Sequence, residues 1–205
     1  MEPHDAAIEA AATAYADAVS KLEPLLKETD DYYSQENYKD DKMAKGKALH
    51  PRLVAAWDAF ATADQKLRGE VEGINDRRAQ EKLAEIEKSE GRKTRYYVEA
   101  LMIQAKRVLR AEDAKTPDIA AITQALNEYE ETIKAAEQAS GTGAKSYLVT
   151  AKQLMRRIRD KVPYSSGDKM MLSNAGSGWM VEGSPPRLLR DYNQLVEAYN
   201  RGANI

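Results

Sequence analysis

The chain has 205 residues, of which 42% are hydrophobic and 31% are charged, and its formal net charge is -2. This length and composition fit a chain that buries a core, and the near-zero charge gives no basic footprint for nucleic acid. The absence of cysteine excludes disulfides, thiol catalysis and Cys-ligated metal clusters in these residues. No apolar run reaches the ~18 residues that a membrane-spanning helix needs.

Apolar residues recur at alternating steps of four and three residues from the start of the chain. Over residues 5–33 the repeat runs through Ile8, Ala12, Tyr15, Val19, Leu22, Leu26, Thr29 and Tyr33. Such a repeat predicts a helix that packs lengthwise against another helix. The polar segment 34–41 predicts a crossing, and we expect a short turn of helix before His50-Pro51.

A second repeat of the same kind begins at residue 53. It runs through Leu53, Trp57, Phe60, Asp64, Leu67, Val71 and Ile74. The apolar repeat is interrupted after Ile74, where we expect a turn or a change of phase, and it resumes at Leu83. Asp64 falls on the apolar seam, so we expect it to pair with a basic residue of another helix, the alternative being a perturbed general base.

Three further helices are predicted after residue 95. Thr116 and Pro117 form an N-cap followed by proline at the first helical position, which predicts a helix start. The segment 141–143 predicts a turn before a helix that ends at Pro163. Residues 164–186 form a long Gly-rich loop, a kind of segment that is often functional or mobile. Within its end, Ser184-Pro185 predicts the start of a last helix.

The elements together predict an all-α fold. We expect an elongated antiparallel bundle of five to six long helices with coiled-coil-like seams, forming a single domain over residues 1–205. Residues 1–41 contain 3 basic and 11 acidic side chains, and residues 42–110 contain 16 basic and 10 acidic ones. Residues 111–143 contain 2 basic and 7 acidic side chains, and residues 144–205 contain 10 basic and 5 acidic ones. The resulting block charges of -8, +6, -5 and +5 favour contacts between successive antiparallel helices.

The candidate motifs for chemistry are weak. Residues 141–146 resemble a phosphate loop, but Ala144 stands where the motif needs glycine, and the segment follows a helix instead of a strand. Residues 176–178 begin like a dinucleotide fingerprint without its third glycine. His50 could bind a metal with Asp40 or Asp41, yet no second histidine lies at ligand spacing. We therefore predict no catalytic residue, no metal and no cofactor.

Three segments carry a resemblance to a known family. They are Tyr38–Asp41 leading into residues 45–51, the pair Trp57 and Phe60, and the tail 182–200. This combination resembles the YiiG-like family of bacterial proteins, which are described as lipoproteins and have no known function. The resemblance implies an all-helical envelope protein that is exported and held by a lipidated N-terminal cysteine. Neither a signal nor that cysteine is in this sequence.

The function that we expect is a non-enzymatic interaction or structural role in the bacterial envelope. On this interpretation the full-length form is periplasmic and lipid-anchored, its partner is an unknown envelope protein, and a homodimer is one possible assembly. The alternative is a carrier for a small ligand or a metal at a tyrosine-rich end of the bundle. The candidate residues for binding a ligand or partner are Tyr38, Asp41, His50, Trp179 and Met180.

Overall fold

The computed structural model describes residues 5–114, 116–136, 141–174, 176–202 and 205. Helices account for 82% of these residues, and no β-strand occurs among them, so the predicted all-α class is confirmed. The chain divides into two compact units, residues 1–78 and residues 79–205. The boundary falls inside one helix. The expectation of a single domain stays a prediction.

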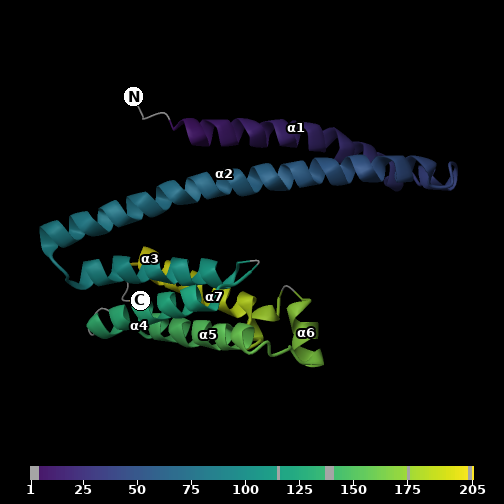
Figure 1. Cartoon of the computed structure of the whole chain (residues 1–205). Helices are drawn as coiled ribbons and strands as arrows, with labels where there is room; N and C mark the ends of the chain where they lie inside the picture. Colours follow the sequence, from purple (N-terminus) through teal and green to yellow (C-terminus); the bar gives the residue numbers. More distant parts are fainter. Residues whose placement is uncertain (1–4, 115, 137–140, 175, 203–204) are drawn as a thin grey trace. The chain divides into compact units, whose positions relative to one another are not determined.

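Unit 1 is a hairpin of two antiparallel helices (Figure 1). It contains α1 (Ala6–Ser34), the 3₁₀ turn η1 (Asn37–Lys39) and the first part of α2 (Ala44–Glu90). The Asp5 carboxylate starts α1 by accepting hydrogen bonds from the backbone N–H groups of Ala7 at 3.0 Å and Ile8 at 3.3 Å. The bounds of α1 and the position of the crossing therefore agree with the sequence pattern.

The helix α2 is longer than the sequence predicts. It continues through His50-Pro51 and past Ile74, where a turn was expected. Pro51 removes one backbone donor close to the helix start, and the residues after Ile74 are neither glycine nor proline. Asn and Asp lower helix stability by only about 0.7 kcal/mol each, which packing easily offsets.

Asp41 joins the two helices at the closed end of the hairpin. One oxygen of its carboxylate accepts a hydrogen bond from the Tyr32 hydroxyl at 2.7 Å, and the other accepts from the backbone N–H of Lys45 at 2.8 Å. Gly46 permits the close approach of the tyrosines, because a Cβ there would lie 2.9 Å from the Tyr33 hydroxyl and 3.1 Å from Cε1 of Tyr32.

Unit 2 is a helical bundle (Figure 1). Its buried apolar residues form one continuous core. Its further elements are α3 (Thr94–Glu112), α4 (Ile119–Ala135), α5 (Thr142–Arg159), α6 (Ser166–Leu172), the 3₁₀ turn η2 (Gly178–Met180) and α7 (Pro185–Asn200). Tyr147 lies at the centre, where its ring meets Tyr129 edge-on and its hydroxyl donates to the Ala105 carbonyl at 2.7 Å. This bond satisfies a buried hydroxyl and fixes α5 against α3.

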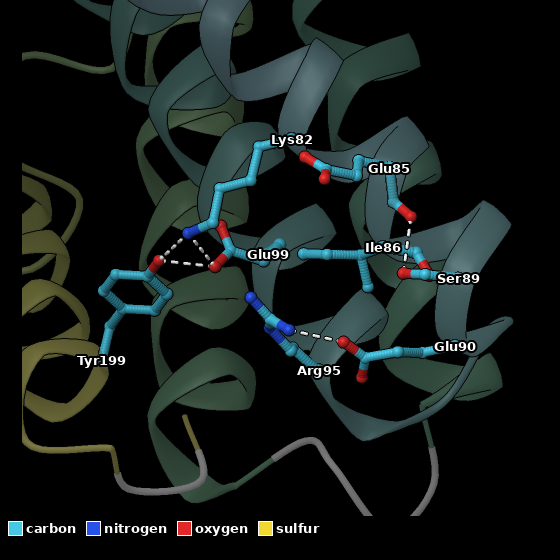
Figure 2. Close-up of polar contacts among 8 residues, drawn as sticks. All are labelled: Lys82, Glu85, Ile86, Ser89, Glu90, Arg95, Glu99 and Tyr199. Atoms are coloured by element: carbon cyan, nitrogen blue, oxygen red, sulfur yellow. Dashed lines mark hydrogen bonds and ion pairs between the residues drawn. The ribbon is translucent and has the colours of Figure 1, made fainter.

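A polar network attaches the end of α2 to the bundle of unit 2. Figure 2 shows the ammonium of Lys82 of α2 directed at Glu99 of α3 and Tyr199 of α7. It lies 2.5 Å from the Glu99 carboxylate and 3.0 Å from the Tyr199 hydroxyl. The Tyr199 hydroxyl also donates to Glu99 at 2.6 Å. The Glu99 contact, followed by that with Tyr199, raises the pKa of Lys82. Three helices are therefore joined by one set of charge-assisted bonds.

Several predicted helix ends in unit 2 are wrong. Asp118, rather than Thr116, caps α4, and its carboxylate accepts from the first free N–H groups of that helix. Gly141 caps α5, so the predicted turn at 141–143 lies mostly within the helix. The segment 164–186 contains α6 and η2 instead of an open loop. The described residues thus hold seven α-helices, compared with the five to six expected.

Ser184 fixes the start of α7, as the sequence predicts. Its side chain is fully buried, accepts from the Arg187 N–H at 3.3 Å and donates to the Val181 carbonyl at 2.7 Å. Through this hydroxyl, η2 is tied to the first turn of α7.

We predict that Ser184→Ala lowers the free energy of unfolding by about 1–2 kcal/mol, because both a cap and a buried hydrogen bond are lost. Ser165→Ala, which removes the exposed cap of α6, is the matched control and is expected to cost about 0.5 kcal/mol. Urea denaturation followed by circular dichroism measures both. Equal losses in the two variants would contradict the role assigned to Ser184.

Candidate functional site

One candidate surface is an apolar groove on the hairpin of unit 1. It has a volume of about 710 Å³ and runs between α1 and α2. Its apolar lining consists of Tyr15, Val19, Leu22, Leu26, Trp57 and Phe60. The Phe60 ring contacts the rings of Tyr15 and Trp57, with centroids 5.6 and 5.8 Å apart. We call these six residues the hairpin groove.

Much of the hairpin groove is exposed, although its residues belong to the apolar repeats. The side that α1 buries is formed by Ala11, Ala18, Leu22 and Tyr32. Val19 and Leu26, which lie on the predicted seam, are 37% and 44% exposed, and Trp57 of α2 is 53% exposed. The apolar stripe of each helix is therefore wider than the contact between them, and part of it has no cover within unit 1.

Opposite charges join the two helices beside the groove. Glu28 of α1 lies 3.1 Å from the Lys45 ammonium and 3.8 Å from the Arg52 guanidinium of α2, and Asp5 lies 4.0 Å from Arg77. These pairs are exposed and each contributes less than about 1 kcal/mol. They agree with the opposite charges of the first two sequence blocks.

The structure separates the five predicted binding residues into two sets. Tyr38, Asp41 and His50 belong to unit 1, whereas Trp179 and Met180 belong to η2 of unit 2. Their union into one binding site stays a prediction.

In unit 1, the structure gives Asp41 a local structural role. Both of its carboxylate oxygens already accept hydrogen bonds, and the bond from Tyr32 is the main cause of its lowered pKa. The Tyr38 ring packs on the Tyr33 ring at a centroid distance of 5.9 Å. His50 is exposed on α2. No group of three or more potential metal-ligating side chains occurs in the part of the chain that the structure describes.

In unit 2, Trp179 is held at the surface by two contacts. Its indole N–H donates to the Gly176 carbonyl at 3.0 Å, and the Arg190 guanidinium lies 4.1 Å from the ring centroid. The ring remains 37% exposed and Met180 47% exposed. The pair therefore offers a small apolar patch on a fixed turn.

A second candidate site lies in unit 2 around Glu112, at the end of α3. It is a pocket of about 290 Å³ whose lining residues are Leu109, Glu112, Asp113, Leu154, Pro185, Pro186, Leu188 and Leu189. Glu112 is only 4% exposed, and neither oxygen of its carboxylate accepts a hydrogen bond of good geometry among the described residues. Burial is the main cause that raises its pKa to about 8, and a weaker interaction with the backbone of Met155 opposes this rise. We call this pocket the Glu112 pocket.

Sequence reasoning missed Glu112, although the signal for it was present. Leu101, Ala105, Val108 and Glu112 follow each other at steps of four, three and four residues, so a carboxylate occupies an apolar seam position. The same reasoning singled out Asp64. That residue pairs with Arg68 of its own helix at 2.7 Å, and not with another helix as expected.

Comparison with known proteins gives a family but no activity. A family model described as a protein of unknown function, DUF3829, matches residues 1–201. The uncharacterized protein YiiG of Escherichia coli (strain K12) is 40% identical over 201 residues, which cover 94% of this chain. The chain spans 57% of the length of that curated relative. No solved structure matches the chain. Among the described residues, no helix combines the length and apolarity that a membrane crossing requires.

We predict a pH-dependent stability that Glu112 controls. Its pKa rises from 4.5 to about 8 on folding, so the native state keeps a proton that the unfolded chain releases between these values. Stability therefore falls as the pH rises through this window, by up to about 1.4 kcal/mol per pH unit, and is constant above it. Tyr147 of α5 interacts electrostatically with this carboxylate. The pKa of Tyr147 is raised mainly by burial and further by the charge of Glu112.

The test compares urea denaturation at pH 5.5 and pH 8.5. Glu112→Gln resembles the protonated state and does not titrate, so the margin by which its stability exceeds that of the natural chain is expected to be larger at pH 8.5 than at pH 5.5. Glu131→Gln, which changes an exposed carboxylate of α4, is the control and should leave the pH dependence unchanged. Parallel pH profiles for the natural chain and Glu112→Gln would show that the pKa of Glu112 is not raised.

Proposed function

This chain belongs to the DUF3829 family of proteins of unknown function, and on that premise we propose that it is a non-enzymatic interaction protein of the bacterial envelope. The interaction that we propose is helix docking on the hairpin groove of unit 1. The observation that carries the proposal is the exposure of Val19, Leu26 and Trp57 in one apolar groove.

Unit 1 supports this function by what its helices leave uncovered. The large buried cluster of the protein is formed by residues from Leu101 onward, so all of its described members belong to unit 2. Unit 1 has only a narrow line of buried residues between two long helices. Two helices alone are a marginal structure in water, and a further helical layer on the groove would remove the exposed apolar surface from solvent.

The occupant that we propose for the hairpin groove is the hairpin of a second copy. The helix α1 carries two lysines and six carboxylates, a net charge of -4, whereas residues 44–78 carry seven basic and five acidic residues, a net charge of +2. In a two-fold symmetric four-helix bundle, each acidic α1 would lie between its own basic α2 and that of its partner. Charges of opposite sign would then alternate around the bundle.

A carrier function at Tyr38, His50 and Trp179 has less support. The two oxygens of Asp41 are already bonded, His50 is exposed, and the aromatic rings of the first crossing pack on one another. The alternative stays a prediction, whereas the uncovered groove favours contact with another helix.

The proposed location is the periplasm, with the full-length protein held by an N-terminal lipid. The support for it is the resemblance of the segments 38–51 and 182–200 to the YiiG-like family. A lipid anchor would concentrate the protein on a membrane surface, where weak helix docking becomes effective.

We predict that the natural chain dimerises in the micromolar range and that Val19→Glu weakens the dimer at least tenfold, because a charge would be buried in the groove. Val54→Glu is the matched control: Val54 is 44% exposed on α2 but does not line the groove. Analytical ultracentrifugation gives the dissociation constants, and circular dichroism verifies that both variants stay helical.

Two outcomes would contradict self-association through the groove. One is a natural chain that remains monomeric at the highest soluble concentration. The other is a dimer that Val54→Glu and Val19→Glu weaken to the same extent, since this would place the interface elsewhere on the hairpin.

The anchoring proposal has a separate test in cells. When the full-length protein is produced in a bacterium fed with an alkyne fatty acid, we expect the label on the protein and the protein in the envelope fraction. A cytosolic, unlabelled protein would overturn the proposed location while leaving the dimer measurement unaffected.

A further inference from the structure

We propose that the Glu112 pocket of unit 2 binds a small molecule with an ammonium group on an apolar body, and that the ammonium contacts the Glu112 carboxylate. This inference is independent of the hairpin groove, which lies in unit 1.

The elements around the pocket explain why Glu112 has no partner. The first two residues of α7, Pro185 and Pro186, lack an N–H, so the helix start offers no donor at these positions. The next two N–H groups, of Arg187 and Leu188, are both bonded to Ser184. A helix N-terminus would ordinarily stabilise a nearby carboxylate, but this one supplies no free backbone N–H in its first turn.

The charges that line the pocket favour a cation over an anion. Glu112 and Asp113 contribute two carboxyl groups, and no lysine, arginine or histidine is among the lining residues. An acidic ligand would meet like charge without compensation, whereas an ammonium would supply the donors that Glu112 lacks. Leaving a buried carboxyl unpartnered is costly, and a bound cation would relieve this cost.

The rest of the lining determines the body of the ligand. It consists of four leucines and two prolines, and Leu154 and Leu188 are 3% and 1% exposed. The volume of about 290 Å³ is at the lower end of the range for ligand pockets, so the ligand is small. A short alkyl or cycloalkyl chain that carries a primary amine matches this lining.

The experiment is calorimetric titration of the full chain with three six-carbon probes that differ only in their head group. They are n-hexylamine, 1-hexanol and hexanoate, and the pH is 8.5, where Glu112 is largely ionised and the amine remains protonated. We expect hexylamine to bind at least tenfold more tightly than hexanol, and hexanoate not to bind.

Three variants locate the binding. Glu112→Gln keeps the shape of the side chain and should reduce hexylamine affinity at least tenfold, whereas Asp113→Asn, next to it, should reduce it less than threefold. Leu189→Trp fills the pocket from its exposed side and should abolish binding of hexylamine and hexanol alike. Val19→Glu, in the hairpin groove, should leave hexylamine affinity unchanged.

Several results would overturn the proposal. Equal affinity for hexylamine and hexanol would show an apolar cavity without recognition of the ammonium. Binding that survives both Glu112→Gln and Leu189→Trp would place the amine at another site. Absence of hexylamine binding to the natural chain, folded as judged by circular dichroism, would leave Glu112 as a buried acid with no ligand role.

Discussion

Two helices that pack only against each other cannot cover an apolar stripe wider than their line of contact. Unit 1 is built on this constraint. Both α1 and α2 have broad apolar faces, but the hairpin buries only a narrow line of residues between them, and large side chains such as Trp57 stay exposed. The proposed assembly follows from this mismatch between the apolar surface that the sequence encodes and the surface that the hairpin covers.

In unit 2, by contrast, the helices of one chain cover one another's apolar faces. Four helices surround Tyr129 and Tyr147, and the hydroxyl of Tyr147 is satisfied by a backbone carbonyl. Glu112 lies at the edge of this core, with a buried carboxylate that accepts no hydrogen bond of good geometry among the described residues. A buried carboxylate of this kind is suited to bind a ligand or a proton, whereas the exposed rings of unit 1 are suited to contact another helix.

The sequence pattern predicted the helices of this protein better than their ends. Ser184-Pro185 marked the start of α7 correctly, because a serine cap followed by proline acts locally. The start of α4 was missed by two residues, because the Asp118 carboxylate accepts from the N–H groups of Ala120 and Ala121 and so begins the helix after Asp118. The helix α6 was missed because seven residues are too few to show an apolar period.

The candidate sites were predicted less well, for a physical reason. A repeat identifies which residues are apolar, but it does not say how many neighbours a helix will have, so the exposure of Val19 could not be foreseen. Glu112 was visible as a carboxylate on a seam, yet the prolines that deny it a donor lie more than seventy residues later in the chain. Only the folded bundle brings the two together.

Gly46 has a consequence for how this hairpin can diverge among relatives. Tyr32 and Tyr33, at the end of α1, lie where its side chain would be, so a larger residue at position 46 would push the end of α1 away from α2. A single substitution at position 46, which does not line the groove, would therefore change the spacing of the two helices. The width of the groove between them would change with it. For the docking proposed above, the choice of partner would therefore change without any substitution in the groove itself.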